Sequence, residues 1–155
     1  MHSIIKHIAN NIGITLFLIL SILVTSNSYS DQTAKDIIQT RKALFSKNYK
    51  TAKKVQSLSA NGNFDEAKEL MTQMSKNYEI LLELFPENSK EGFKTEALST
   101  IWEEKEDFNN LMKKASNDMI ELVAIIEGSD NISGTIKKLM WSNCKACHNK
   151  YREEH

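Results

Sequence analysis

The chain has 155 residues, in which 20 Lys and Arg balance 20 Asp and Glu, so its formal net charge is zero. This balance argues against nucleic acid or an anionic membrane surface as the main partner. Only one proline and five glycines occur, and the polar positions favour Lys, Glu and Asn. Such a composition suits helices rather than sheets.

Residues 1–30 have the layout of a secretory signal peptide. Lys6 is the only Lys or Arg in this segment, no acidic residue occurs, and residues 12–24 are almost wholly apolar. Ser28 and Ser30 are small residues just before the expected cleavage point. A bilayer span needs about 20 apolar residues, so we expect cleavage and no stable membrane insertion afterwards. An uncleaved N-terminal anchor is the alternative.

The remaining residues 31–155 have the size of one domain, with 19 basic and 20 acidic side chains. Apolar residues recur at helical spacing over four stretches, at about 31–59, 64–85, 95–126 and 135 to the end. Short polar segments separate these stretches. Within the last of these segments, Asn131-Ile132-Ser133 matches a glycosylation acceptor, but we interpret it as a loop with a helix cap.

Four amphipathic helices with short joins bury all of their apolar stripes most simply in an antiparallel up-down bundle. The expected fold class is therefore all-α, with a four-helix bundle. Most methionine and aromatic side chains on these stripes are interpreted as ordinary core residues, because stripes at this spacing usually reflect packing.

Near the end of the chain, Cys144-Lys145-Ala146-Cys147-His148 has the spacing of a c-type haem attachment motif. Two cysteines three residues apart lie on one helix face, so both thiols can bond the same edge of a haem. His148 would then bind the iron axially. The alternatives are a redox disulfide, which is typical of a βαβ context, and a zinc site, for which these three residues and His155 are the only candidate ligands.

The stretch from Cys144 to Arg152 resembles the CxxCHxxF/YR ending of the cytochrome c′ family, the class II c-type cytochromes. Arg41-Lys42 resembles the Arg-Gln pair of the family's first helix. Thr95-Glu96-Ala97, followed by Ile101-Trp102 and Phe108, resembles its T-x-A…IW…F stretch. The resemblance implies a four-helix bundle with one haem c, covalently attached on the C-terminal helix.

The resemblance also implies further haem contacts. Arg41 and Lys42 would lie near the haem propionates, where cations form charge-assisted hydrogen bonds. Thr95 and Glu96 would contact the haem edge, and Arg152 would lie beside the proximal face, where its charge favours reduced iron. The alternatives are a solvated helix face for Arg41, a helix cap for Thr95 and Glu96, and a solvated terminal side chain for Arg152.

The sixth iron position decides the chemistry. No methionine occurs between Met1 and Met71, so the first helix cannot supply the thioether that six-coordinate relatives use. His155 follows His148 by seven residues, on the same helix face, and cannot easily reach the opposite side of the haem. Phe45 falls where the family places its distal apolar residue, which predicts a five-coordinate iron with a dry, crowded distal face. The alternative places Phe45 in the core.

Nitric oxide and carbon monoxide bind in such a pocket without a distal donor, whereas dioxygen needs one. We therefore expect a periplasmic haem protein that exchanges electrons and binds these two gases. The alternatives are a six-coordinate or distally sealed dedicated electron carrier, and an exported zinc-binding or scaffold bundle. A peroxidase needs a distal acid–base group, for which no histidine is available, so we expect no enzyme.

The expected partners are small redox proteins and the gas ligands, with no nucleic acid. Family members are often dimers through their first two helices. Exposed apolar residues expected there, such as Leu58 and Leu84, would permit a homodimer. Because haem is joined to c-type cytochromes outside the cytoplasm, export by residues 1–30 predicts the periplasm as the location.

Overall fold

A computed structural model describes residues 33–154, so the predicted signal peptide and His155 lie outside the described residues. The chain divides into a unit of residues Met1–Asp36 and a larger compact unit of residues Ile37–His155. All residues that line the cavity described below, from Arg41 to Arg152, belong to the second unit. Between residues 33 and 154, no helix is both long and apolar enough to cross a membrane.

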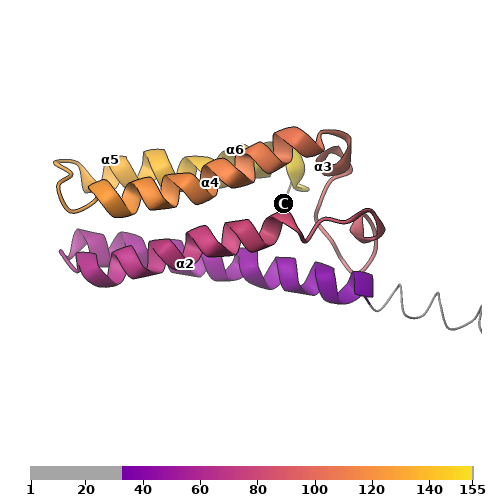
Figure 1. Cartoon of the computed structure of the whole chain (residues 1–155), viewed down its shortest axis with the longest axis horizontal. Coiled ribbons are helices and arrows are strands. Elements are labelled where there is room, and N and C mark those ends of the chain that lie inside the picture. Colours follow the sequence, from indigo (N-terminus) through magenta and orange to yellow (C-terminus); the bar gives the residue numbers. More distant parts are fainter. Residues whose placement is uncertain (1–32, 155) are drawn as a thin grey trace, which may run out of the picture. The chain divides into compact units, whose positions relative to one another are not determined.

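Helices account for nearly all regular structure in the part of the chain that is described. The first helix covers residues 33–60. It is followed by α2 (Phe64–Leu82), the 3-10 turn η1 (Glu87–Ser89), α3 (Thr100–Glu103), α4 (Lys105–Ile125), α5 (Ile132–Ile136), the π-helical turn η2 (Lys137–Trp141) and α6 (Ser142–Tyr151). Successive long helices reverse direction (Figure 1), which confirms the predicted all-α antiparallel up-down bundle.

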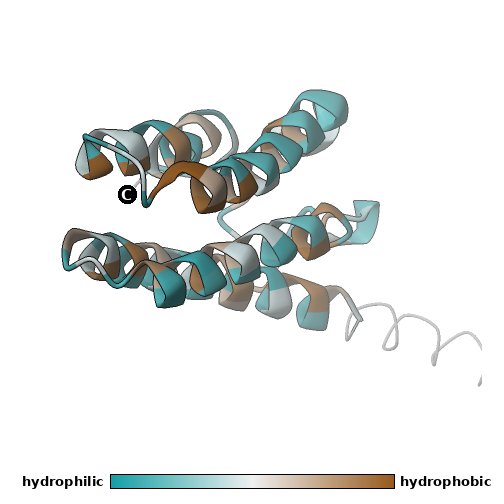
Figure 2. Cartoon of the chain, turned by 60° about the vertical axis from the view of Figure 1, so that its left-hand side comes forward, coloured by the Kyte–Doolittle hydropathy of each residue, from teal (hydrophilic) through white to brown (hydrophobic). Residues whose placement is uncertain are grey.

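The helices of the larger unit pair into two layers. The first helix lies beside α2, and α4 lies beside the run of α5, η2 and α6 (Figure 1). Packing of α2 on α4 joins the layers, and α4 also packs on η2 and α6. Hydrophobic and hydrophilic residues alternate around each helix (Figure 2), as amphipathic helices require.

Methionine and aromatic side chains fill the core between the layers, as the sequence predicted. Burial of each such side chain stabilises the fold by about 1.5–3 kcal/mol relative to leaving it exposed. The largest fully buried side chains of this core include Met71, Met74, Phe108, Met112, Met119 and Met140, together with Leu81 and Leu122. Leu58 and Leu84, which the sequence analysis treated as exposed, are half-buried and pack against this core. On the first helix and α2, Tyr49 (52%) and Ile80 (50%) are the exposed large apolar side chains.

Asn131 caps the C-terminal run of helices. Its side-chain oxygen accepts a hydrogen bond of 2.9 Å from the backbone nitrogen of Gly134, which satisfies a free amide of the first turn. A β-carbon at Gly134 would lie only 2.5 Å from the Asn131 amide, so the glycine permits this close approach. The interpretation of Asn131 as a cap is confirmed, although the helix begins at Ile132 rather than at Thr135.

The predicted single helix over residues 95–126 is wrong in its first part. Residues 95–99 form no helix, α3 covers only Thr100–Glu103, and the backbone of Glu104 (φ −118°, ψ 45°) separates it from α4. Thr95 and Glu96 therefore do not cap a helix, which overturns that alternative.

Residues 95–99 pair instead with the C-terminal tail. The Leu98 backbone nitrogen donates to the Tyr151 carbonyl at 3.1 Å, and the Glu153 nitrogen donates to the Glu96 carbonyl at 2.9 Å. An isolated antiparallel bridge joins Ala97 to Arg152 between these two bonds. The tail thus satisfies backbone groups that a helix would otherwise pair internally, and it fixes Glu96 next to the end of α6.

Candidate functional site

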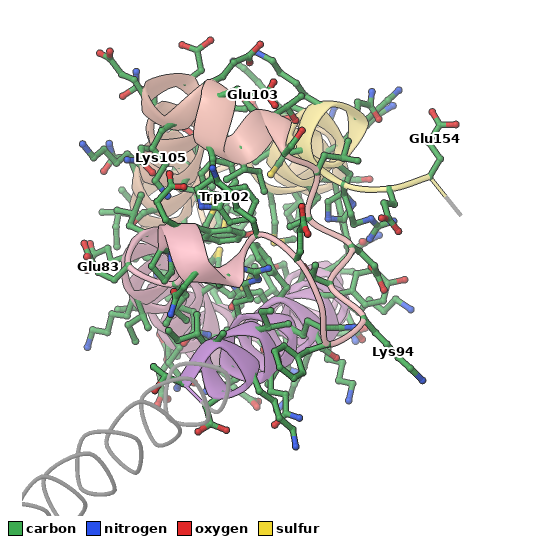
Figure 3. All side chains as sticks on the ribbon, turned by 90° about the vertical axis from the view of Figure 1, so that its right-hand side faces the viewer. Glu83, Lys94, Trp102, Glu103, Lys105 and Glu154 are labelled. Carbon is green, nitrogen blue, oxygen red and sulfur yellow. The ribbon has the colours of Figure 1, made fainter. Side chains whose placement is uncertain are left out.

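A cavity of about 760 Å³ opens between the first helix and α6. This volume falls within the usual range for cofactor sites, about 300–1,000 Å³. Segments far apart in the sequence meet at one end of the bundle, where Trp102 lies near the middle and Lys94 and Glu154 lie at the periphery (Figure 3). The walls of the cavity are mostly apolar and include Phe45, Phe85, Ile101, Phe108, Leu111 and Met112.

The haem attachment motif lines one wall of this cavity. Cys144, Cys147 and His148 all border it, so α6 presents the three side chains together, as their spacing predicted. Both cysteines are free thiols and half-buried. The π-helical turn η2 directly precedes α6. Such turns often occur at functional sites, because they shift the register of the side chains that follow.

Burial keeps the two thiols protonated. It raises the pKa of Cys144, and it raises the pKa of Cys147 to about 11 with a further contribution from Cys144. A catalytic CxxC motif needs a depressed thiol pKa, so this environment argues against the redox-disulfide alternative. Burial, and then Arg152, lowers the pKa of His148, which favours the neutral imidazole that a metal ion requires.

Arg41 lies on the opposite wall and is only 2% exposed, which overturns the alternative of a solvated helix face. One terminal nitrogen donates to Ser89 Oγ (2.9 Å) and the Leu84 carbonyl (3.2 Å). The other donates to the Ser89 carbonyl (2.9 Å) and to Thr95 Oγ1 (2.6 Å). The guanidinium also stands 4.6 Å from the centre of the Phe85 ring. Because it is buried, its pKa falls to about 10.

Lys42 and Glu96 lie at the rim of the cavity, next to Arg41. The Lys42 ammonium donates to the Lys94 carbonyl at 2.7 Å and stands 3.9 Å from the Glu96 carboxylate. Phe93 and Lys94 both adopt positive φ values, 49° and 56°, after Gly92 at 84°. This left-handed turn is costly for non-glycine residues, and it directs the chain that follows along the cavity.

Arg152 also borders the cavity and is half-buried, so it is not the solvated terminal side chain of the alternative. Its Nε atom is buried and has no hydrogen-bond partner among the described residues. Native proteins rarely leave a buried donor unsatisfied. This one therefore suggests that an acceptor from outside the chain belongs in the cavity.

Phe45 lines the same wall as Arg41, one helical turn further along the first helix. Its ring meets the Phe85 ring edge-on, with the centroids 6.4 Å apart, and it is half-buried against the core. The side chain of Phe45 therefore lines the cavity and also packs at the edge of the core. Both interpretations from the sequence, a cavity residue and a core residue, apply to it.

Several residues of the cavity were not among the predicted site residues. Asn48 and Tyr78 are buried on the walls. Trp141 also borders the cavity and meets the ring of Tyr49 edge-on, with the centroids 6.1 Å apart. In the sequence, a polar residue within an apolar stripe was the available indication for Asn48. For Trp141 the only indication was its position three residues before Cys144.

The cavity suits a flat, apolar macrocycle that carries two carboxylates. Apolar walls surround its middle, two thiols and an imidazole stand on α6, and Arg41, Lys42 and Arg152 supply cations. The unpartnered Arg152 Nε fits an anionic or carbonyl acceptor there. Across residues 33–154, no group of three or more His, Cys, Asp or Glu side chains is arranged to hold a metal ion by itself.

A family model described as Cytochrome C′ matches residues 36–152. Cytochrome c′ of Rhodopseudomonas palustris is 29% identical over 120 residues, which cover 76% of this chain and 82% of the relative. A solved structure of cytochrome c′ from that species matches with a TM-score of 0.63 and 25% identity, over 77% of this chain and 97% of its own.

A nitric oxide complex of a variant cytochrome c prime from Alcaligenes xylosoxidans shares the fold, with a TM-score of 0.66 and 15% identity over 78% of this chain and 97% of its own. The family model spans most of the chain, including the first helix, residues 95–102 and α6. The chain therefore belongs to the cytochrome c′ family of electron-transfer haem proteins, which carry one covalently attached haem c with its iron.

Proposed function

We propose that this chain is a periplasmic haem protein that exchanges electrons and binds nitric oxide and carbon monoxide at a five-coordinate iron. The haem supplies one-electron redox chemistry and a coordination position for small gases. Cys144 and Cys147 would hold it through two thioether bonds, and His148 would be the axial iron ligand. All three border the cavity from α6.

Other residues of the chain would position the macrocycle. Both terminal nitrogens of Arg41 are already bonded to the protein, so this side chain would act on a propionate chiefly through its buried charge. Lys42 would act in the same way from the rim. Thr95 holds Arg41 in place and Glu96 borders the cavity edge, while Arg152, with its unpartnered Nε, would lie beside the proximal face.

One observation carries the proposal of an open sixth position. The wall opposite α6 presents Phe45, and residues 33–60 contain no methionine or histidine. Within the described chain, Met112 is the one thioether that borders the cavity, and it belongs to α4, which packs beside α6. A phenyl ring cannot ligate iron, so that side would stay available to a small gas. The nitric oxide complex of the Alcaligenes xylosoxidans relative agrees with this proposal.

The same wall favours electron transfer and gas binding over enzymatic catalysis. Between residues 33 and 60 it bears no histidine that could act as a distal acid–base group. Export to the periplasm rests on the signal-peptide pattern of residues 1–30. Redox partners would be small proteins, and a homodimer would involve exposed side chains other than Leu58 and Leu84.

Absorption and EPR spectra of haem-loaded protein, with and without nitric oxide, test this proposal. We expect a high-spin spectrum that changes when the gas is added. Phe45→Met places a thioether on the facing wall and should produce a low-spin, gas-resistant form, whereas the control Phe45→Leu should remain high-spin. A low-spin, gas-indifferent spectrum of the unmodified protein would instead identify a dedicated electron carrier.

A further inference from the structure

Asn48 is a buried amide on the cavity wall. It is 3% exposed, and it borders the cavity from the first helix, three residues after Phe45. Residues three apart share a helix face, so its side chain stands next to the phenyl ring that we place opposite His148. Burying an amide costs free energy unless its polar atoms form hydrogen bonds, so this position calls for partners of Asn48.

A neighbouring residue fixes the orientation of this amide. Asn77 of α2, itself 7% exposed, donates from Nδ2 to the Asn48 side-chain oxygen at 2.7 Å. With its oxygen occupied, Asn48 directs its Nδ2 group away from Asn77. That nitrogen is buried and has no hydrogen-bond partner among residues 33–154.

Tyr78 is a second polar neighbour of the Asn48 amide. Burial and the Cys144 thiol raise the pKa of its hydroxyl, and a smaller hydrogen-bond contribution from the Asn48 amide opposes this increase. The two side chains are therefore in contact, but the contact falls outside normal hydrogen-bond distance and angle, so Asn48 Nδ2 keeps no well-formed partner among residues 33–154. The Asn48 amide hydrogens thus remain available to an acceptor inside the cavity.

We propose that Asn48 Nδ2 is the hydrogen-bond donor of the ligand pocket, and that it admits small ligands carrying negative charge beside the apolar gases. The inference rests on the open sixth position of the proposed function. Carbon monoxide binds well without a donor, whereas an anionic ligand in a buried pocket gains strongly from one. The distal side is then not uniformly dry and apolar: Phe45 restricts access, and Asn48 selects for charge.

Two ligands of different polarity test the role of Asn48 in haem-loaded protein. Fluoride is titrated into the oxidised protein by absorbance, and the carbon monoxide complex of the reduced protein is followed by its C–O stretching band. In Asn48→Leu we expect fluoride to bind about tenfold more weakly, as loss of one charge-assisted hydrogen bond implies. Carbon monoxide affinity should change less than about twofold, since it needs no donor, and the C–O band should move to higher wavenumber.

Asn109→Leu is the matched control. Asn109 of α4 is a half-buried asparagine with an unpartnered side-chain oxygen, but it does not border the cavity. The same chemical change there should leave the fluoride affinity and the C–O band unchanged. If Asn48→Leu and Asn109→Leu change the fluoride affinity and the C–O band to the same extent, the cause is the loss of a buried amide in general, and the proposal is overturned.

Other outcomes separate this inference from the proposed function. If carbon monoxide and fluoride bind but Asn48→Leu changes neither fluoride affinity nor the C–O band, Asn48 is not the donor. If the unmodified protein binds neither nitric oxide nor carbon monoxide, the open position itself is wrong and the inference fails with it. If Asn48→Leu does not fold, the unmodified protein provides the test. An iron–fluoride stretching band at the same wavenumber in H₂O and D₂O would show that no exchangeable donor contacts the ligand, and would overturn the proposal.

Discussion

The α6 wall of the cavity takes Cys144, Cys147 and His148 from five consecutive residues, whereas the facing wall collects its side chains from distant segments. There, Arg41 is fixed by Ser89 and Thr95, which follow it by 48 and 54 residues. The chemistry of the α6 wall is therefore set by which residues occupy a single short stretch of helix. The facing wall depends on the packed fold, so the two walls should respond differently to substitution.

Removing both thiols should give the largest effect, because it eliminates covalent haem attachment on α6 and leaves the contacts of the facing wall unchanged. Cys144→Ser combined with Cys147→Ser should abolish covalent haem attachment, since neither thioether bond can form. Mass spectrometry of the purified protein before and after acid–acetone extraction measures this. Ala146→Ser, an exposed change between the two cysteines, should retain the haem. Covalent haem in the double variant would refute our assignment of these thiols.

Disrupting the facing wall should reduce stability rather than attachment. Arg41→Met leaves the Leu84 and Ser89 carbonyls without their donor, and we expect unfolding to require about 2–3 kcal/mol less free energy. The loss is limited because burial already disfavours the Arg41 charge, as its lowered pKa shows.

Urea denaturation of the haem-free chain is the appropriate measurement for Arg41→Met. The exposed Lys47→Met on the same helix should change stability by no more than about 0.5 kcal/mol. Arg41→Lys should not restore stability, because one ammonium group cannot reproduce the fork of the guanidinium. Equal stability of Arg41→Met and Lys47→Met would show that the Arg41 contacts do not hold this wall.

Substitution in residues 95–99, which pair with the end of α6, should have an intermediate effect on stability. Leu98→Pro removes the backbone hydrogen that binds the Tyr151 carbonyl, and it should lower stability by about 1–2 kcal/mol in thermal unfolding. Ser99→Pro is the matched control, because Ser99 is the N-cap of α3 with φ −57°, a value that proline adopts. If both prolines destabilise alike, pairing with the C-terminal tail is not the cause.

The smallest expected effect concerns the outer end of α6. Glu104 accepts hydrogen bonds from Lys150 and Tyr151, and the Lys150 bond chiefly holds the Glu104 pKa below its ordinary value of 4.5. The ionised carboxylate therefore contributes stability above about pH 4.5, and this contribution is lost as the pH falls through the lower folded-state pKa.

Glu104→Gln tests this contribution across pH. The stability difference between it and the unmodified protein should be small at pH 7, should decrease further in acid, and should also decrease at high salt because these groups are exposed. Glu103→Gln, on the neighbouring exposed position, is the matched control and should change stability little. Chemical denaturation at neutral and acidic pH makes the comparison, and a difference that grows in acid would contradict the assigned direction.

The sequence by itself determined the features that depend on neighbours three or four residues away. The apolar stripes, the haem motif of α6 and the Asn131 cap all arise within single helical turns, so their residue types and spacing were sufficient. Met71 and Phe108 could likewise be assigned to the core from their periodicity.

Only the tertiary structure decided the facing wall. The predicted helix began near Thr95, but the backbone of residues 96–98 is bonded to Tyr151 at the end of α6 and to Glu153 beyond it, more than 50 residues away in the sequence. These bonds take the place of the internal pairing that a helix would provide there. For the same reason the sequence could not show that Arg41 is bonded to Ser89, or that Asn77 turns the Asn48 amide nitrogen away from itself. Such contacts depend on how packed helices bring distant polar atoms together, and local spacing carries no information about that arrangement.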